Sequence, residues 1–257
     1  MYPKFSIITV SYNSAHYITS AIESVLSQDY PNIEYIIIDG DSTDNTVDII
    51  QSHANKSPEV IKWISEPDKG MYDALNKGIR MATGDIIGAL NSDDFYSRTN
   101  ALSTIADLFH DNPDLQSCFA DVRYVKPDNL NKTVRYYSSK RFHPGRFKYG
   151  YMPAHPTFFV RKECFTKYGL YKTDYKIAGD YELLLRFLYI YKISYKYLSL
   201  DIIKMRKGGI STKNLNSNYV LNKEIIRGCK ENGMYTNMAT LSLKYFVKFF
   251  EFIRPRN

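Results

Sequence analysis

The chain has 257 residues, of which 44% are hydrophobic, so it can bury a sizeable core in one domain with an appendage. Its net charge of +7 suits an anionic partner such as a nucleotide, a phospholipid surface or a nucleic acid, although a solvated basic surface without a single target would give the same excess. Three distant cysteines argue against a zinc site or a disulfide framework, and the sequence shows neither a signal peptide nor an apolar run of about 18 residues that could span a membrane.

Short apolar runs alternate with amphipathic stretches through the first third of the chain. The runs are rich in β-branched residues and end at polar turns, whereas the stretches repeat apolar residues at helical spacing. Strands are predicted at 5–10, 33–38, 60–65 and 86–90, and helices at 15–27, 46–54 and 72–81. This order predicts an α/β fold with a doubly wound, mainly parallel sheet, helices on both faces, and ligands at the carboxyl ends of the strands.

The rest of the chain alternates less regularly. Its predicted elements are a helix at 100–109, antiparallel strands at 119–125 and 133–137, a mobile basic and aromatic loop at 138–154, a strand at 155–160, helices at 162–168 and 180–191, and helical structure after 212. No repeat or low-complexity tract is visible.

Two acidic clusters follow strands of the predicted sheet. Asp39 follows the second strand, and Asp93 and Asp94 follow the fourth, so all three are expected at one edge. Adjacent carboxylates at a strand end suit Mg²⁺ or Mn²⁺, which offsets their repulsion and can bridge to a diphosphate. The alternative is a structural loop in which Asp94 caps a helix or tightens a turn.

The stretch around Asp39 has a second interpretation. Asp39, Asp41 and Thr43 form an Asp-x-Asp-x-Thr pattern that resembles phosphatases with an aspartyl nucleophile, the haloacid dehalogenase group. In that group a later Gly-Asp ends an apolar strand and supplies a metal ligand. Here Asp85 precedes its strand and would lie at the wrong edge, which weakens this interpretation.

Two longer stretches resemble the family 2 glycosyltransferases with the GT-A fold. They read ITVSYNSAHYITSAIESVLSQDYPNIEYIIIDGDSTDNT and EPDKGMYDALNKGIRMATGDIIGALNSDDFY, and the resemblance extends over roughly residues 4–210. It implies metal-assisted transfer of a sugar from a nucleotide diphosphate, usually with inversion. It also implies a catalytic domain at 1–212, with a nucleotide-binding half at 1–97 and an acceptor half at 98–212, followed by a helical extension at 213–257.

The resemblance assigns roles to individual residues. Asp39 matches the acid that hydrogen-bonds the base, most often uracil, and Asp94 and Asp93 match the metal motif. The family often has Asp where Asn91 stands, so altered donor contacts, or a sugar-nucleotide-binding homologue without turnover, are implied. The residues implied to contact the nucleotide sugar are Thr9, Tyr12, Asn13, Asp39, Asp68, Lys69, Asn76, Asn91, Asp93, His155 and Arg206.

The stretch IAGDYELLLRF matches the family's acidic pair at the start of a helix. Gly179 stands where the first acid is usual, and Asp180 is the second, which makes Asp180 the candidate general base. Asp180 could instead cap its helix, or do both. His155 could be structural rather than near the acceptor, and Arg206 could lie in a solvated turn beside a glycine pair that allows loop closure.

The last residues form a basic amphipathic pattern. Apolar side chains between 240 and 256 fall on one helical face, with Lys and Arg largely elsewhere, which suits the membrane surface or packing on the catalytic domain or a second subunit. Bacterial members that resemble this chain often extend lipid-linked polysaccharide repeats, so we expect a UDP-sugar donor, a glycan or lipid-linked acceptor, and peripheral contact with the inner face of the cytoplasmic membrane. A homodimer is compatible with the pattern, and no motif indicates nucleic-acid binding.

Overall fold

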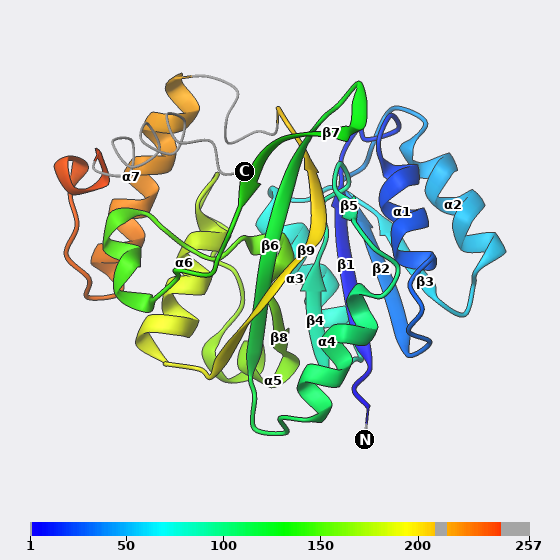
Figure 1. Ribbon diagram of the computed structural model, residues 1–257. Helices are drawn as coiled ribbons and strands as arrows, with labels where there is room; N and C mark the ends of the chain where they lie inside the picture. The colour runs from blue at the N-terminus through cyan, green and yellow to red at the C-terminus, as the bar shows by residue number, and fades with distance from the viewer. Residues whose placement is uncertain (1, 209–214, 243–257) are drawn as a thin grey trace.

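The computed structural model describes residues 2–208 and 215–242. Over these residues one sheet runs through the molecule in the order β3-β2-β1-β4-β8-β6-β9-β5, and β7 pairs with β6 at the side. Helices cover both faces of this sheet (Figure 1). The predicted α/β fold class is therefore confirmed.

The first half of the sheet is parallel. Its strands are β1 (Phe5–Ser11), β2 (Ile33–Asp39), β3 (Ile61–Ser65) and β4 (Ile86–Ala89). β1 pairs in parallel with both β2 and β4, and β2 pairs in parallel with β3. All four strands consequently end at the same edge, with Ser11 directly opposite Asp39. The four strands predicted from the apolar runs are confirmed.

The second half of the sheet is mixed. Its strands are β5 (Phe95–Tyr96), β6 (Ser117–Lys126), β7 (Asn129–Tyr137), β8 (Phe159–Arg161) and β9 (Tyr195–Arg206). β6 runs antiparallel to β7 and β8 and parallel to β9, so the predicted antiparallel pair is confirmed. No element was predicted at β9, although that strand pairs with most of β6 and joins it to β5 in the sheet.

Two predictions for the middle of the chain are wrong in detail. The strand expected at 155–160 begins only at β8, because the preceding 3₁₀ turn η2 (His155–Thr157) contains Pro156. The segment expected as a mobile loop contains the 3₁₀ helix η1 (Pro144–Tyr149), whose Phe147 is completely buried. That segment is thus anchored to the core.

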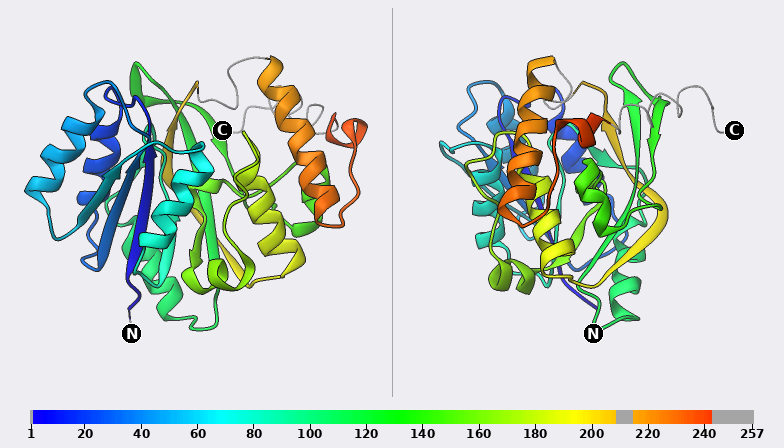
Figure 2. Two further views of the ribbon diagram at one scale, coloured as in Figure 1. Left: turned by 180° about the vertical axis from the view of Figure 1, so that it is seen from behind. Right: turned by 90° about the vertical axis from the view of Figure 1, so that its left-hand side faces the viewer.

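The helices divide between the two faces. They are α1 (Ile18–Leu26), α2 (Thr46–Lys56), α3 (Met71–Met81), α4 (Ala101–His110), α5 (Lys162–Tyr168), α6 (Gly179–Leu185), a π-helical turn η3 (Arg186–Ile190), and α7 (Leu215–Glu231). α1, α2 and α4 pack on one face, whereas α3, α5, α6 and α7 pack on the other (Figure 2). Each face has its own hydrophobic core. Alternate side chains of each central strand point into one core or the other, so Ile37 lies in one and Ile38 in the other.

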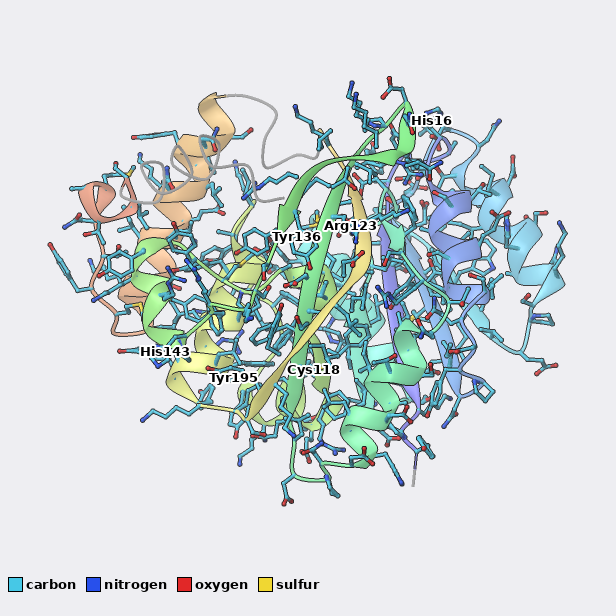
Figure 3. The ribbon with its side chains drawn as sticks, viewed as in Figure 1. His16, Cys118, Arg123, Tyr136, His143 and Tyr195 are labelled. Atoms are coloured by element: carbon cyan, nitrogen blue, oxygen red, sulfur yellow. The ribbon has the colours of Figure 1, made fainter. Side chains whose placement is uncertain are left out.

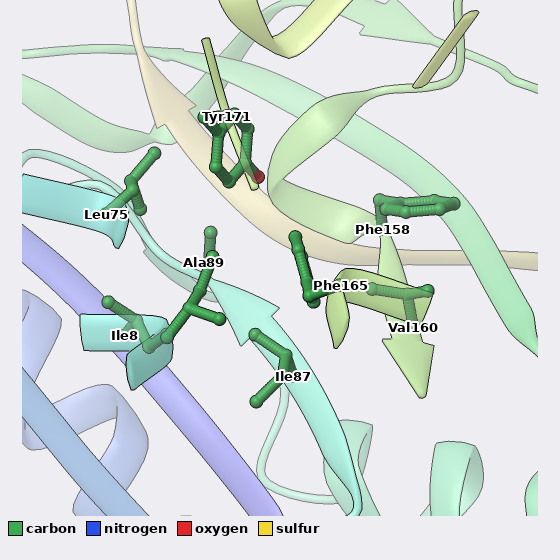
Figure 4. A pocket seen from close by; sticks show the side chains of 9 residues that line it. Ile8, Leu75, Ile87, Ala89, Phe158, Val160, Phe165 and Tyr171 are labelled. Atoms are coloured by element: carbon green, nitrogen blue, oxygen red, sulfur yellow. The ribbon is translucent and has the colours of Figure 1, made fainter. Parts of the chain in front are cut away.

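The interior beneath the strand ends is closely packed. A void of about 10 Å³ lies between β1, α3, β4 and Tyr171, and its lining is apolar except for the Tyr171 hydroxyl (Figure 4). This space is no larger than about one water molecule. A nucleotide-sized ligand would therefore have to bind outside the core, at the loops that follow the strands.

Glu34 joins β2 to the start of β4. It is 2% exposed, and its carboxylate accepts hydrogen bonds from Ser6 Oγ, from Thr83 N and Oγ1, from Gly84 N and from Lys62 Nζ. Burial raises the pKa of Glu34, but the hydrogen bonds from Ser6, Thr83 and Lys62 outweigh burial and lower the pKa to about 2 from its ordinary 4.5. The ionised Glu34 side chain therefore stabilises the contact between β2 and the start of β4.

We expect Glu34→Gln to lower the free energy of unfolding by about 3 kcal/mol at neutral pH, since each pKa unit corresponds to about 1.4 kcal/mol. The native pKa is depressed, so this contribution is complete above about pH 4.5 and is lost as the pH falls toward 2. Urea unfolding of both proteins at several pH values checks this. A stability difference that does not narrow in acid would contradict it.

Two further predictions concern the C-terminal part of the chain. α7 packs on the α3 and α6 face through Ile225 and Cys229, and the proposed boundary at 212/213 stays a prediction. Most of the amphipathic stretch at 240–256 lies outside the described residues. Within the part of the chain that the structure describes, no helix is both long and apolar enough to cross a membrane.

Candidate functional site at the carboxyl ends of the strands

Hydrogen bonds join the loops after β1 and β2 at the edge of the sheet where the parallel strands end. Asn13 N donates to Ser42 Oγ (2.8 Å), and Asn13 Oδ1 accepts from Thr43 N (2.9 Å). Asn13 has a φ of 47°, a left-handed conformation that Asn tolerates better than most residues. The neighbouring Tyr12 is 63% exposed, so this turn presents an aromatic ring to solvent.

Asp39 holds the ends of three strands in place. The side chain is completely buried, and its two oxygens accept from Ser11 Oγ (3.0 Å), Ser42 N (2.9 Å), Ser42 Oγ (2.6 Å) and Ser65 Oγ (2.8 Å). A carboxylate offers about four lone-pair positions. Because the protein itself uses all four in this structure, Asp39 holds the three loops together, and the contact with the base that the resemblance implies stays a prediction.

The loop after β3 lies against the loop after β2. A Cβ added to Gly40 would be 2.5 Å from Asp68 Oδ2, so only glycine lets this carboxylate approach. Asp68 Oδ1 accepts from Gly70 N (2.7 Å), and Lys69 is exposed. Asp68 therefore lies beside the Asp39 turn, with Lys69 next to it in the chain, and their contact with a nucleotide stays a prediction.

The acidic pair follows β4. Asp94 is 1% exposed, and its Oδ2 accepts from Asn91 Nδ2 (2.8 Å), while Asp93 is half-buried. Burial, and next the charge of Asp93, raise the pKa of Asp94 well above its usual range; burial also raises the pKa of Asp93. Asn91 can donate to Asp94, which an Asp at that position could do only if protonated. Asn in place of the usual Asp at position 91 thus stabilises the ionised form of Asp94, which burial disfavours.

The carboxylates of this pair fit a hard divalent cation. Mg²⁺ is commonly held by one or two carboxylates together with substrate phosphates, so two acids at an open edge suffice when a diphosphate is the other ligand. Among residues 2–208 and 215–242 no group of three His, Cys, Asp or Glu side chains is arranged to hold a metal. Asp93 and Asp94 would therefore share the ion with a donor.

Arg206 joins this cluster from the end of β9. Its guanidinium donates to the Asp93 carbonyl oxygen and to Ser20 Oγ (2.8 Å), and it lies over the rings of Tyr17 (5.0 Å) and Phe95 (4.9 Å). The side chain is 8% exposed. The alternative of a solvated turn is wrong for Arg206, because it is packed between α1 and β5.

Asp180 lies in the first turn of α6 and is half-buried. Its Oδ1 accepts from Tyr181 N (2.7 Å) and lies 3.5 Å from the Tyr72 hydroxyl, which donates to the Ile177 carbonyl oxygen (2.6 Å). Burial raises the pKa of Asp180, and the charge of His155 opposes this increase. Since Tyr72 belongs to the first turn of α3, it links Asp180 to the loop that carries Asp68.

The missing first acid of the pair has a structural reason. A Cβ added to Gly179 would lie 2.6 Å from the Tyr72 ring, closer than Cβ atoms occur in proteins. The Tyr72 ring therefore occupies the space that a side chain at 179 would need. Asp180 is left as the carboxylate at this helix start.

His155 and Tyr171 form a polar pair beside Asp180. His155 Nε2 is 2.7 Å from the Tyr171 hydroxyl, and the Tyr171 ring stacks on Tyr72 with centroids 5.7 Å apart. Burial lowers the pKa of His155, while Asp180 raises it. His155 is thus close enough to the candidate base for their charges to act on each other, and its contact with the acceptor or donor stays a prediction.

Two residues expected to contact the nucleotide are buried. Thr9 is 0% exposed, and its hydroxyl accepts from Tyr35 Oη (2.9 Å). Asn76 is 3% exposed, and its amide exchanges two hydrogen bonds with the backbone of Tyr171 (2.9 and 3.0 Å). Neither side chain reaches the surface, so both are corrected: Thr9 packs within the core, and Asn76 positions Tyr171.

Glu224 is a residue that the sequence did not single out. From α7, its carboxylate accepts from three consecutive backbone N–H groups, those of Lys176 (2.7 Å), Ile177 (2.9 Å) and Ala178 (2.8 Å). These residues form the loop that leads into Asp180. The helix predicted as an extension therefore clamps the backbone next to the candidate base, which no local sequence signal indicates.

The loops around the site are linked to one another. Ser14 Oγ is 2.9 Å from Ser92 Oγ, which joins the loop after β1 to the loop of the acidic pair. Tyr72 joins α3 to Asp180 on the other side. The arrangement gives an open edge with an exposed aromatic ring, an acidic pair with raised pKa values, and a separate carboxylate at a helix start.

Comparison with known proteins identifies the family of the chain. Residues 6–169 match the family described as Glycosyl transferase family 2. An uncharacterized glycosyltransferase from Mycobacterium tuberculosis is 31% identical over 187 residues, which cover 72% of this chain and 68% of that protein. A PGL/p-HBAD biosynthesis glycosyltransferase from Mycobacterium bovis is 24% identical over 226 residues, which cover 88% and 83%.

Two solved structures share the fold. S. aureus TarS 1-349 in complex with UDP-GlcNAc has a TM-score of 0.66 and 19% identity, covering 90% of this chain and 68% of that chain. The mannosyltransferase PcManGT from Pyrobaculum calidifontis, in complex with GDP-Man and Mn²⁺, has a TM-score of 0.61 and 15% identity, covering 99% and 82%. From the family match and the fold together, the chain is a member of glycosyltransferase family 2 with the GT-A fold.

Proposed function

We propose that this protein transfers a sugar from a nucleotide diphosphate donor, with UDP favoured, to a glycan or lipid-linked acceptor with inversion at the anomeric carbon. One observation carries the proposal: the acidic pair Asp93 and Asp94 follows β4, and a separate carboxylate, Asp180, lies at a helix start that Tyr72 ties to the loop after β3. Structures of two proteins with this fold hold nucleotide sugars, which supports the donor class.

The donor would lie along the strand ends. Tyr12 and Asn13 would line the nucleotide with Asp68 and Lys69, while Asp39 would act as a positioning residue that keeps these loops together. Arg206 would meet the diphosphate near Asp93. In our proposal the residues that contact donor or metal are Tyr12, Asn13, Asp68, Lys69, Asn91, Asp93, Asp94 and Arg206.

A divalent cation held by Asp94 and Asp93 would offset the negative charge that grows on the leaving diphosphate. The protein supplies the other half of the chemistry. Asp180 Oδ2 would accept the proton of the acceptor hydroxyl as that oxygen attacks the anomeric carbon, while Oδ1 stays bonded to Tyr181 N. His155 would lie beside this proton transfer.

The aspartyl phosphatase interpretation receives no support. The Asp39 carboxylate is buried and accepts four internal hydrogen bonds, which leaves no attacking oxygen. Asp85 precedes β4 at the opposite edge of the sheet, where its Oδ2 accepts from Lys4 N (2.8 Å). A homologue that binds sugar nucleotides without turnover remains as the alternative outcome of the test below.

Calorimetry with UDP and Mn²⁺, followed by an assay of UDP release from UDP-sugars with candidate acceptors, tests the proposal. We expect metal-dependent UDP binding together with UDP release. Binding without any release would favour the module that does not turn over its ligand, and the absence of UDP binding would overturn the donor assignment.

We also propose peripheral attachment to the inner face of the cytoplasmic membrane through the stretch at 240–256. This rests on the amphipathic pattern of that stretch. Membranes containing the full chain should release it in high salt or mild detergent. A chain found wholly in the supernatant before any wash would argue against the attachment.

The clamp from α7 gives a separate prediction. Glu224→Gln puts an amide NH₂ beside three N–H donors, so the loop at 176–178 should shift and misplace Asp180. We expect kcat to fall by roughly ten- to a hundredfold with little change in KM for the donor. The matched change Glu163→Gln, at an exposed position of α5, should leave both constants unaltered. A parallel loss in the two variants, or a change in KM alone, would refute the positioning role.

A further inference from the structure

Two arginines, Arg135 of β7 and Arg146 of η1, stack on tyrosine rings. Arg135 stands opposite Tyr124 in the β6–β7 pair, and its guanidinium carbon is 5.4 Å from the Tyr124 ring centroid and 5.6 Å from that of Tyr137. Arg146 of η1 lies 4.9 Å above the Tyr151 ring. Both arginines are half-buried. Such stacking holds the planar groups in place while leaving their edges free to donate.

Neither guanidinium is matched by a carboxylate within the described ranges. Within these ranges the Arg135 guanidinium makes no ion pair or hydrogen bond, and the Arg146 guanidinium donates only to the Arg141 carbonyl oxygen (2.9 Å). Arg123 of the adjacent strand β6, labelled in Figure 3, is by contrast paired, since its guanidinium lies 2.6 Å from Asp201. A half-buried guanidinium with up to five unused N–H donors is suited to an external anion.

The two arginines are connected to the candidate site. Burial raises the pKa of Tyr124, the ring on which Arg135 also stacks; the charge of Arg135 opposes this increase and the charge of Asp94 adds to it. Burial raises the pKa of Tyr137 to about 12, and the positive charges of Arg135 and Arg146 both oppose this increase. The Tyr137 hydroxyl donates to the Met152 carbonyl oxygen (2.6 Å), which joins β7 to the segment that precedes His155. Arg135 therefore stacks on a tyrosine whose hydroxyl is bonded to Met152, next to Tyr151, on whose ring Arg146 stacks.

We propose that Arg135 and Arg146 bind a phosphate group of the acceptor substrate. This rests on the proposed glycosyltransferase function and specifies its acceptor as anionic. The donor diphosphate would have Arg206 and the acidic pair, whereas these two arginines stack on tyrosine rings at 137 and 151, in the segments that lead to His155. Their planar donors match the oxygens of a phosphate mono- or diester. The phosphate can be carried by a prenyl lipid or by the glycan itself.

The test uses the full chain saturated with UDP and Mn²⁺, so that the donor diphosphate position is filled. Inorganic phosphate, farnesyl phosphate and uncharged farnesol are titrated by calorimetry. We expect both phosphates to bind and farnesol not to bind. Tighter binding of farnesyl phosphate would indicate a lipid-borne group, and equal affinity for both phosphates would indicate a phosphate carried by a glycan.

Arg135→Gln and Arg146→Gln should each weaken phosphate binding about tenfold or more while leaving the Kd for UDP unchanged. Arg135→Lys keeps the positive charge but loses the planar guanidinium, so its phosphate affinity should lie between those of the unaltered protein and Arg135→Gln. Lys140→Gln, which removes an exposed charge of the same segment, is the control and should bind phosphate as the unaltered protein does. Thermal unfolding verifies that each variant folds. The proposal is overturned if both Gln variants bind phosphate as the unaltered protein does, or if they weaken the binding of UDP and not that of phosphate. Failure of the unaltered protein to bind UDP would instead count against the proposed function.

Discussion

Replacing Asp180 by Asn is expected to lower kcat by about a thousandfold, within the range that a positioned general base contributes. The amide has nearly the shape of the carboxylate but cannot take a proton from the acceptor hydroxyl. Binding of UDP with Mn²⁺ should be unchanged, because in our proposal Asp180 contacts the acceptor hydroxyl and not the diphosphate or the metal. Rates of UDP release and calorimetric Kd values measured on the same preparations check both parts.

The pH dependence provides a second readout for Asp180. Burial raises its pKa, so the base becomes protonated and inactive at a higher pH than an ordinary Asp would. The acid limb of kcat/KM should therefore lie above the usual Asp range. Tyr72→Phe removes a hydroxyl that lowers this pKa and should move the limb further upward. A limb at the same pH in both proteins would contradict the assignment.

Asp174→Asn is the matched control for Asp180→Asn. It removes a carboxylate six positions earlier on the loop before α6, where Asp174 is exposed and pairs with Arg227. We expect activity close to that of the unaltered protein. If Asp180→Asn also retained its rate, another group would have to act as the base, and the inverting mechanism proposed for this site would be wrong.

Replacing Asp94 by Asn should abolish the dependence of UDP binding on Mn²⁺ and weaken UDP binding by at least about tenfold when the metal is present. The amide is neutral and is a poorer ligand for a hard cation. It also removes the charge that burial and Asp93 already disfavour, so the fold should become no less stable. Calorimetry with and without EDTA, together with thermal unfolding, checks the two effects.

Asp85→Asn is the matched control for Asp94→Asn. Asp85 is an exposed carboxylate at the other end of β4 and should not influence metal-dependent binding. UDP binding that stayed metal-dependent in Asp94→Asn would refute the metal assignment. An equal loss in the Asp85→Asn control would point to a disturbed strand instead of a lost ligand.

The sequence by itself determined the parallel half of the fold, and it did so through local signals. Each of β1, β2, β3 and β4 is an apolar run that ends at a polar turn, and the helix after each of the first three repeats its apolar residues at helical spacing. That order allows few topologies and brings Asp39, Asp68 and Asp94 to one edge. The family motifs along these strands could be recognised for the same reason, since they are contiguous in the chain.

The tertiary structure alone decided what those residues touch. β9 has mixed composition and is a strand because it pairs with β6, more than seventy positions earlier. Asn76 binds the backbone of Tyr171, the Tyr72 ring fills the space beside Gly179, and Glu224 reaches the loop before Asp180. These contacts join residues 46 to 107 positions apart. Periodicity reports only on neighbours within a few residues, so partners that meet through packing leave no signal in the sequence.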